Sequence, residues 1–587
     1  MVEKKAVEIT QACAKAANKL SNDQWQALIG LHRTLLHEHH DFFLASQHPT
    51  ASPALRRLAK KYAMPARMWR HGIHSFLELL RQQLPGSLEH MLAFVYIAYS
   101  MMALLMESVP RFLETWIECL GDLARYRMAI VEVDLRDREI WSKIARTWYN
   151  RAADLSPDVG RIQHHLAVLA RPNIVQQLFY YSKALVSIKP FENARESIML
   201  LFNPLLDTED PSYDKYRATE ASFVSAFAFL FKRGSLQKYQ LHIETFQQGL
   251  SDHITRAAAE WKTQGPEVAA SIIAGVLDFG KPENPVWTMY RQHIAAIESR
   301  KSSDETMEQG QIDAEDVSIR DLLFEEFWSD VDAKAPVLAR APTWIPAEVG
   351  LGSSQAVSIY VLEMLRSAVA TNAGKIGDRN VVPFMNFILG FLWSLARIGG
   401  PLIYLEAHIP WSNIVLFLNM LGRSGVSERV TAVTFPQSTS GTGRQLPEDI
   451  PARGAVWAPD IFPPDFFRNT VADEDERSLE LPSHTAPRYE RCLWFGVRLA
   501  SLNRYIRYNV STKQFSLSNY AMALEQGGRG ESHQPGPTQS HTAAEKPHLL
   551  QDDTGDVEMT DEQASGSSPL EADSDYVMID RGSMVRI

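Results

Sequence analysis

Basic side chains are concentrated between residues 51 and 81, where they could bind an anion. This stretch contains a single acid, Glu78. Its basic residues are Arg56, Arg57, Lys60, Lys61, Arg67, Arg70 and Arg81. A phosphate group is best held by several guanidinium groups, which offer charge-assisted and often bidentate hydrogen bonds. The composition therefore predicts a local positive face.

A second group of polar residues, Arg125, Tyr126 and Arg127, follows further along the chain. If their helix lies across a groove from the first basic stretch, the two together would form an anion-binding pocket. In the alternative interpretation, the basic stretch is an ordinary solvated surface, and Arg125 pairs with an internal acid such as Asp122. Composition alone leaves both interpretations open.

Common catalytic and metal-binding motifs are missing from the sequence. It has no Gly-x-Gly-x-x-Gly turn, Walker lysine motif or Gly-x-Ser-x-Gly elbow in a suitable context. The run His37-Glu-His-His-Asp41 differs from the zinc pattern His-Glu-x-x-His and has no obvious third ligand. Cys13, Cys119 and Cys492 are too widely separated for a disulfide framework, which favours a reducing compartment. We predict a protein that is not an enzyme, with no metal and no cofactor.

Helices are the elements expected to position these residues. Apolar residues recur with helical spacing between residues 25 and 36 and again between 77 and 84, and strand signals are nearly absent. The stretch 149–157 is echoed by 180–190, and each ends at a proline after small alanines. This quasi-repeat is typical of tetratricopeptide-like hairpins, whose stacked helices present a surface for recognising peptides or proteins. The fold class is therefore predicted to be all-α.

Two apolar runs, 90–106 and 384–397, are the most hydrophobic parts of the chain. Both are shorter than the roughly 20 apolar residues that span a bilayer. Asn386 and Arg397 would also be costly inside a membrane. We expect both runs to be buried helices and expect no membrane partner. No signal-peptide core follows the N-terminal residues, so the chain is expected to stay inside the cell.

The 587 residues are predicted to form four parts. These are a helical array at 1–205, a helical-hairpin domain at 206–422, an irregular clamp with a terminal helical segment at 423–522, and a disordered acidic tail at 523–587. The hairpin domain is expected to begin with helices at 218–250 and 251–277. The tail carries most of the formal net charge of −11 and either solvates the protein or acts as a regulated interaction segment.

Several stretches resemble the Ever Shorter Telomeres and SMG adaptor family, which includes telomerase-recruitment and nonsense-mediated decay factors. They are Gly121–Arg127, Gly160–Ala170, Pro190–Arg195, Pro410–Trp411 with Phe417–Asn419, and Leu446–Asp449 followed by Arg453–Gly454. The resemblance covers most of residues 1–505. It implies an N-terminal domain that looks like 14-3-3 with tetratricopeptide-type helices. Some members end in a nuclease-like PIN domain, and this chain has an acidic tail there, similar to a fungal-like member without that domain.

The resemblance also implies site residues. In 14-3-3-like domains, basic residues on one helix and an Arg-Tyr pair on another hold a phosphoserine, and these map to the helix after Trp69 and to Arg125 and Tyr126. His74 lies where the decay adaptors carry a phosphate-binding lysine, and Arg81 lies where 14-3-3 proteins have a second arginine. Because histidine is a weaker and pH-dependent cation, Arg81 or Arg70 would have to compensate.

The function implied by the resemblance is a non-enzymatic adaptor in nonsense-mediated mRNA decay, present in nucleus and cytoplasm. Its basic groove would bind a phosphorylated protein, by resemblance the helicase of the decay pathway. The alternative is a telomerase-associated adaptor in telomere maintenance whose groove binds RNA or single-stranded DNA, with steep salt dependence. A third possibility is a scaffold for unmodified peptides, in which Arg125 is only a packing residue.

Overall fold

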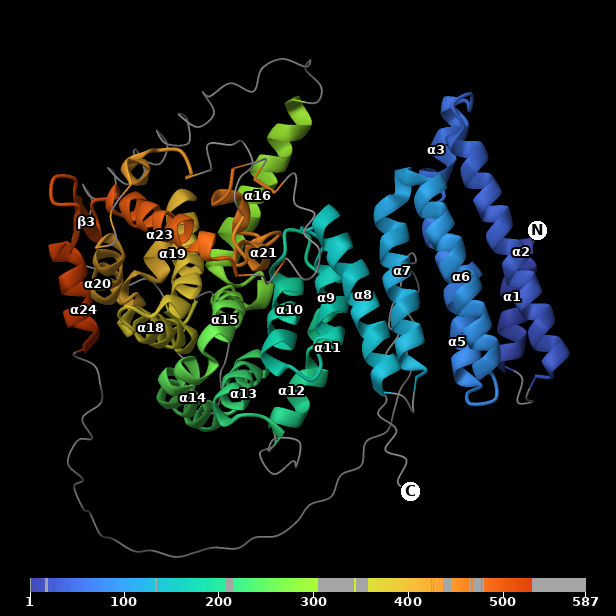
Figure 1. Cartoon of the computed structure of the whole chain (residues 1–587), viewed down its shortest axis with the longest axis horizontal. Helices are drawn as coiled ribbons and strands as arrows, with labels where there is room; N and C mark the ends of the chain where they lie inside the picture. The colour runs from blue at the N-terminus through green and yellow to red at the C-terminus, as the bar shows by residue number, and fades with distance from the viewer. Residues whose placement is uncertain are drawn as a thin grey trace, which may run out of the picture. The chain divides into compact units, whose positions relative to one another are not determined.

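The computed structural model describes residues 2–15, 20–131, 135–206, 215–304, 343–344, 357–423, 425, 427–436, 445–463, 466–467, 477 and 480–529 (Figure 1). Residues Met1–Arg529 form one compact unit. The predicted disordered tail, 523–587, lies outside the described residues from position 530 onward, and the prediction is wrong for 523–529, which are helical. Among the described residues the fold is helical, as the sequence predicts, with two small two-stranded sheets.

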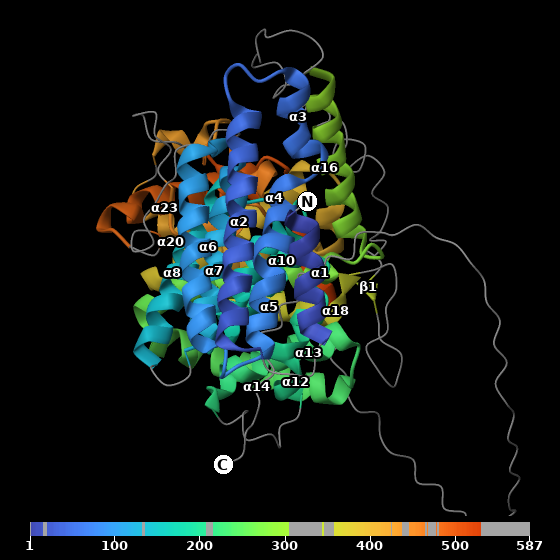
Figure 2. The same cartoon turned by 90° about the vertical axis from the view of Figure 1, so that its right-hand side faces the viewer.

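The first part of the chain is a group of helices that lie side by side (Figures 1 and 2). They are α1 (Val2–Lys15), α2 (Asn22–Gln47), α3 (Pro53–Lys61), α4 (Met64–Arg67), the π-helical turn η1 (Met68–His74), α5 (Ser75–Gln82), α6 (Leu88–Ser108) and α7 (Leu113–Ala129). A capping box starts α2, because the Ser21 hydroxyl accepts from the backbone N–H of Gln24 and the Gln24 side chain accepts from that of Ser21. The π-helical turn is a wide turn of a kind that often occurs at functional sites.

Helix α6 contains the first of the two apolar runs. With a mean hydropathy of 1.6, α6 is long and apolar enough to cross a membrane by length and composition alone. The core helix of a globular protein can have the same length and composition. One face of α6 is buried, with Phe94, Ala98 and Leu105 fully covered, and the helix packs against α2, α5 and α7. The prediction of a buried helix is confirmed for this face and wrong for the opposite one, where Tyr96 and Leu104 are exposed.

The predicted helical hairpins follow as α8 (Leu135–Leu155), α9 (Gly160–Leu169), α10 (Ile174–Val186), α11 (Ala194–Ser197) and α12 (Met199–Leu206). Helices α8 and α10 end shortly before Pro157 and Pro190, which cannot continue a helix. Gly160 lets α9 start against α10, because a Cβ atom there would lie 2.3 Å from the carbonyl oxygen of Ala184. The quasi-repeat therefore corresponds to closely packed hairpins.

The next helices are α13 (Ala218–Lys232), α14 (Leu236–Ala257), α15 (Trp261–Val276), α16 (Pro285–Asp304), α18 (Ile359–Gly374), α19 (Val382–Arg397) and α20 (Trp411–Gly422). The predicted continuous helix at 218–250 is two helices. Arg233 takes a left-handed conformation with φ 55° that ends α13, and the Ser235 hydroxyl caps α14. Helix α14 then extends to Ala257, so the predicted boundary at Ser251 is also displaced.

Helix α19 belongs to an extended hydrophobic core. Its residues from Val382 to Ala396 are all buried, which fits the second apolar run. The same core cluster includes side chains from Ala167 to Leu524, on both sides of positions 205 and 422. The domain boundaries at these two positions stay predictions.

The last described elements are α21 (Asp449–Ala452), α23 (Thr485–Ala500), β3 (Ile506–Asn509), β4 (Gln514–Leu517) and α24 (Asn519–Arg529). Strands β3 and β4 form an antiparallel hairpin, and β1 (Thr343–Trp344) pairs in parallel with β2 (Val357–Ser358). Short 3-10 turns occupy Pro110–Phe112, Ala258–Glu260, Asp278–Gly280, Arg379–Val381, Pro401–Tyr404, Glu406–His408, Glu428–Thr431, Ala458–Asp460 and Pro482–His484.

Candidate functional site

Two of the five predicted phosphate-binding residues converge on the carboxylate of Glu78. The Arg81 guanidinium donates to it from Nε at 3.0 and 3.2 Å and from Nη2 at 2.6 Å. The Tyr126 hydroxyl donates to its Oε1 at 2.8 Å. A third predicted residue, His74, has its ring centroid 6.4 Å from that of Tyr126. We call these four residues the Glu78 cluster.

Local helix geometry explains the Glu78 cluster. Glu78 and Arg81 are three residues apart on α5, so they face the same way. His74 is the last residue of the π-helical turn that leads into α5, and Tyr126 reaches across from α7. Hydrogen bonding to Glu78, opposed by burial, raises the pKa of Arg81 above its ordinary value. In the sequence Glu78 stands out only as the single acid of the basic stretch, and its central position was not predicted.

Arg125 lies in a different network, directed toward α8. Its Nη2 donates to the Asp122 carboxylate at 3.1 Å, and its Nε donates to the Tyr149 hydroxyl at 3.2 Å. Tyr149 in turn donates to Asp122 at 2.6 Å. Burial alone would raise the pKa of Asp122, but the charges of His165 and Arg125 hold it below its ordinary value. The pairing of Arg125 with Asp122, the alternative interpretation of the sequence, is thus present.

Arg70, the fifth predicted residue, is exposed on the π-helical turn. His71, next to it, has a lowered pKa chiefly because it is partly buried. Within the described residues, no group of three or more His, Cys, Asp and Glu side chains is arranged to hold a metal ion.

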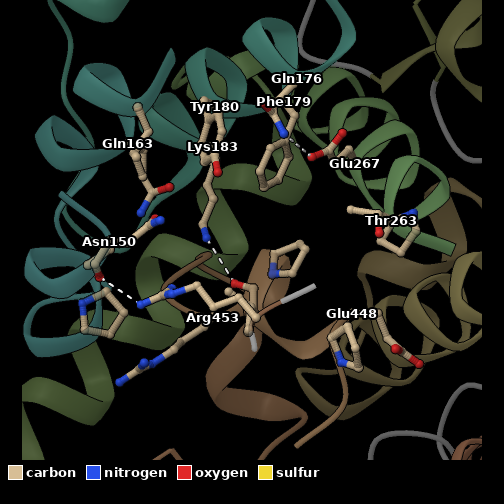
Figure 3. A pocket seen from close by; sticks show the side chains of 18 of the residues that line it. Asn150, Gln163, Gln176, Phe179, Tyr180, Lys183, Thr263, Glu267, Glu448 and Arg453 are labelled. Carbon is tan, nitrogen blue, oxygen red and sulfur yellow. Dashed lines mark hydrogen bonds between the residues drawn. The ribbon is translucent and has the colours of Figure 1, made fainter. Parts of the chain in front are cut away.

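A cavity of about 230 Å³ lies between α8, α9, α10, α15 and the segment 446–454 (Figure 3). Among the described residues that line it, five are basic and three are acidic. The basic ones are Arg146, Lys183, Lys262, Arg453 and Arg477, and the acidic ones are Asp154, Glu267 and Glu448. The lining therefore has an excess of positive charge.

Long-range contacts close one end of this cavity. Arg453 donates to the Asp154 carboxylate at 3.2 Å and to its backbone oxygen at 2.7 Å. Arg477 pairs with the same carboxylate and donates to the backbone oxygen of Asn150. Gly454, at φ +81°, lies directly against Pro157, where a Cβ atom would come within 1.7 Å of the Pro157 carbonyl oxygen. The segment 446–454 is thereby fixed against the first hairpin.

Two buried ionisable groups face the cavity with few polar contacts. Lys183 donates to the backbone oxygen of Ile450 at 3.3 Å, and burial together with the charges of Arg453 and Arg477 lowers its pKa to about 7. Glu267 accepts from Gln176 at 3.0 Å, and burial raises its pKa to about 7. Each group is therefore close to changing its charge at neutral pH.

This cavity was not predicted from the sequence. Its residues come from four helices and from the segment 446–454, which is almost 300 positions from α8 in the sequence. The spacing of apolar residues within helices does not indicate that this segment and α8 are in contact. The only signal was the stretch Leu446–Asp449 followed by Arg453–Gly454, which contributed to the family resemblance.

In comparisons with known proteins, the chain matches Est1 and SMG proteins. Residues 145–257 match the family model described as the Est1 DNA/RNA binding domain. The chain is 20% identical over 492 residues to EST/SMG-like protein 2 of Saccharomyces cerevisiae, covering 72% of this chain and 40% of that protein. It is 35% identical over 86 residues to telomerase-binding protein EST1A of Danio rerio, covering 14% and 5%. It is 36% identical over 99 residues to nonsense-mediated mRNA decay factor SMG7 of Arabidopsis thaliana, covering 16% and 9%.

A solved crystal structure of Est1 and Cdc13 contains a chain with a similar fold. The TM-score is 0.50 at 8% sequence identity, and the match covers 88% of this chain and 99% of that chain. At this identity the likeness concerns the fold alone. The chain matches 40% or less of the length of each of the curated relatives above.

Proposed function

We propose that the chain is a non-enzymatic adaptor of telomerase or of nonsense-mediated mRNA decay, because its matches are to Est1 and SMG proteins. The names of the relatives support both pathways, since one is a telomerase-binding protein and another is a decay factor. The decay role is the first proposal, with the telomerase role as the alternative. An adaptor of either kind would work in the nucleus and the cytoplasm.

For the decay role, the adaptor recognises a phosphorylated protein at the Glu78 cluster. The observation that carries this proposal is the convergence of Arg81 and Tyr126 on one carboxylate. Donors that already hold one anion have the geometry to hold another. The Arg81 side chain is 37% exposed, so a phosphate group can reach it from solvent.

Glu78 is then an internal competitor for the phosphate. A phosphoserine carries about −1.5 to −2 charges and three acceptor oxygens, against one charge and two oxygens for a carboxylate. It would therefore bind the same donors more strongly, but only after Glu78 rotates away, because two anions side by side repel each other. Arg125 supports the site indirectly, by fixing α7 to α8.

The first testable prediction concerns this competition. Glu78→Gln should strengthen binding of a phosphoserine peptide by about tenfold, because it removes a charge that occupies the site. Arg81→Gln should weaken binding by about tenfold or more, because it removes the exposed guanidinium. Both are measured by fluorescence anisotropy on the full chain, with phosphorylated and unphosphorylated versions of one serine peptide from the decay helicase.

The matched control is Glu89→Gln, which makes the same charge change at an exposed position in the first turn of α6. It should leave binding unchanged. Circular dichroism verifies that each variant is folded. Equal binding of both peptides by the native protein and by Glu78→Gln would refute the phosphoserine site.

Nucleic-acid binding is the second candidate function. The match of residues 145–257 to the Est1 DNA/RNA binding domain favours it, together with the basic cavity that these residues help to line. Binding of single-stranded RNA should then fall steeply with salt concentration. It should not change in Arg81→Gln, which separates this candidate from the first.

A further inference from the structure

We propose that the cavity between α8, α9, α10, α15 and the segment 446–454 binds a single phosphate-bearing nucleotide, either free or as one residue of a strand. This inference deepens the nucleic-acid function and is independent of the Glu78 cluster. It rests on the charge of the cavity, on a buried amide that faces it, and on its position within the matched domain.

At the closed end of the cavity, positively charged side chains outnumber the carboxylates that could neutralise them. The carboxylate of Asp154 pairs with both Arg453 and Arg477, and Lys183 is close enough to feel the charges of all three groups. Lys183 is only 7% exposed, and its ammonium donates to a neutral carbonyl oxygen. No carboxylate lies within ion-pair distance of it among the described residues.

A buried ammonium without an anionic partner is unfavourable unless a ligand supplies the charge. A phosphate group matches this environment, because it offers several acceptor oxygens and up to two negative charges. Lys183 would hold the phosphate as a point charge, as lysine does in many phosphate sites.

Uncharged groups of the lining suit a nucleobase. Gln163 is 2% exposed, lines the cavity and makes no hydrogen bond to other described residues, so its amide is available to a ligand. Amide side chains can donate to and accept from the edges of bases. Phe179 and Tyr180 add aromatic surface beside Lys183, and bases stack on such surfaces.

The dimensions and position of the cavity favour a nucleotide over the acid of a peptide. A space of about 230 Å³ is too small for a duplex and suits one small ligand. The lining residues from Arg146 to Lys183 all fall within the stretch that matches the Est1 DNA/RNA binding domain. An acidic peptide side chain would use the cations but would leave Phe179, Tyr180 and Gln163 uncontacted.

The test is isothermal titration of the full chain with AMP, adenosine, inorganic phosphate and a short single-stranded RNA. AMP should bind at one site. Adenosine and phosphate should each bind at least about tenfold more weakly than AMP, since each lacks half of the contacts. Lys183→Met should weaken AMP binding about tenfold or more. The control Lys238→Met, the same change at an exposed position on α14, should have no effect.

A second measurement covers the case in which Lys183→Met does not fold. An amine-reactive reagent should label Lys183, because a lowered pKa leaves much of the amine unprotonated near neutral pH, and AMP should protect it from labelling. Gln163→Met, which keeps the length of the side chain, should lower the affinity for AMP several-fold and leave phosphate binding unchanged.

Three results would overturn the proposal: no saturable binding of AMP, equal binding of phosphate and AMP, or equal binding of AMP by folded Lys183→Met. Occupation of the cavity by an acidic peptide that AMP does not displace would also overturn it. Competition between RNA and AMP would assign the ligand to a strand, and binding of AMP without such competition would assign it to a free nucleotide. None of these results depends on the Glu78 variants.

Discussion

Lys183 links the charge of the cavity to the stability of the protein. Burial and the two neighbouring arginines lower its pKa from 10.5 to about 7 in the folded chain. Between these values the unfolded chain binds more protons than the folded one, so the free energy of unfolding rises with pH. The cost of burying the charged lysine is full below about pH 7 and disappears above about pH 10.5.

Lys183→Met should therefore stabilise the protein in a pH-dependent way. At about pH 7 the gain is expected to be on the order of a few kcal/mol, and near pH 10 it should be much smaller. Urea denaturation of both proteins at the two pH values measures the difference. Lys238→Met should show the same small effect at both, and an equal gain for Lys183→Met at both would contradict the mechanism.

Glu267 should behave in the opposite sense. Burial raises its pKa from 4.5 to about 7, so the folded chain binds more protons than the unfolded one between these values. Its contribution to stability is full below about pH 4.5 and is lost as the pH rises through about 7.

Glu267→Gln keeps a polar partner for Gln176 and cannot become charged. It should raise the free energy of unfolding by on the order of 2 kcal/mol at about pH 8 and by much less at about pH 5. Denaturation curves at the two pH values test this. Glu244→Gln, at an exposed position on α14, is the matched control. A gain that is no larger at the higher pH would disprove the assignment.

Gly454 is a position where the backbone permits no side chain. Gly454→Ala combines a left-handed φ of +81° with a Cβ atom that would overlap the Pro157 carbonyl. It should destabilise the protein by about 2 to 4 kcal/mol. Gly374→Ala, which meets no atom within 4 Å, should be neutral or slightly stabilising in the same denaturation assay. Equal effects of the two changes would mean that the segment is not held against the hairpin.

At the scale of elements, buried ion pairs hold the segment 446–454 on α23. Arg488 donates to the Glu448 carboxylate at 2.6 and 2.8 Å, and Arg491 donates to Asp449 at 2.5 Å. All four side chains are 3% exposed or less. Removing one partner of such a pair leaves an uncompensated buried charge.

Arg488→Met should lower the free energy of unfolding by about 3 to 5 kcal/mol, and adding Glu448→Gln should recover part of the loss. Arg507→Met, at an exposed position of β3, is the control and should cost little. Chemical denaturation of the two single variants and the double variant gives the coupling energy. An additive double variant would show that the pair does not hold the segment.

Individual helices could be predicted from the sequence where the spacing of apolar residues agrees with the positions of helix-ending residues such as proline. The apolar run at 384–397 became α19, and Pro157 and Pro190 follow the ends of α8 and α10. The π-helical turn at Met68–His74 was not predictable, because packing rather than spacing selects it. The β3–β4 hairpin was missed although Ile506, Tyr508 and Phe515 carry a weak alternation, which four-residue strands hardly reveal.

The site was predictable only in its composition. Anion-binding residue types and two of the residues that meet, Arg81 and Tyr126, followed from the sequence and the family resemblance. The place of Glu78 between them depends on how α5 and α7 face each other. The cavity depends on contacts such as Asp154 with Arg453, 299 positions apart, which local pattern does not encode.

For the whole molecule, a core that crosses position 205 predicts strong mutual dependence of the two sides. Leu178 and Leu185 of α10 belong to the same core cluster as Trp261 and Ile272 of α15, and the two helices pack together. A fragment of residues 1–205 should therefore melt at a lower temperature than residues 1–529. Thermal unfolding followed by circular dichroism measures this, and an unchanged melting temperature would identify 1–205 as an independent domain.

The separation of Asp154 from Arg453 also imposes an order on biosynthesis. A ribosome that has added Asp154 must add 299 more residues to reach Arg453, the first of the two arginines that pair with it. Throughout that time α8 and α10 lack their covering segment, and the nucleotide cavity has no closed end. A nascent chain would thus acquire nucleotide binding only near the completion of the compact unit, so the ligand would distinguish finished molecules from unfinished ones.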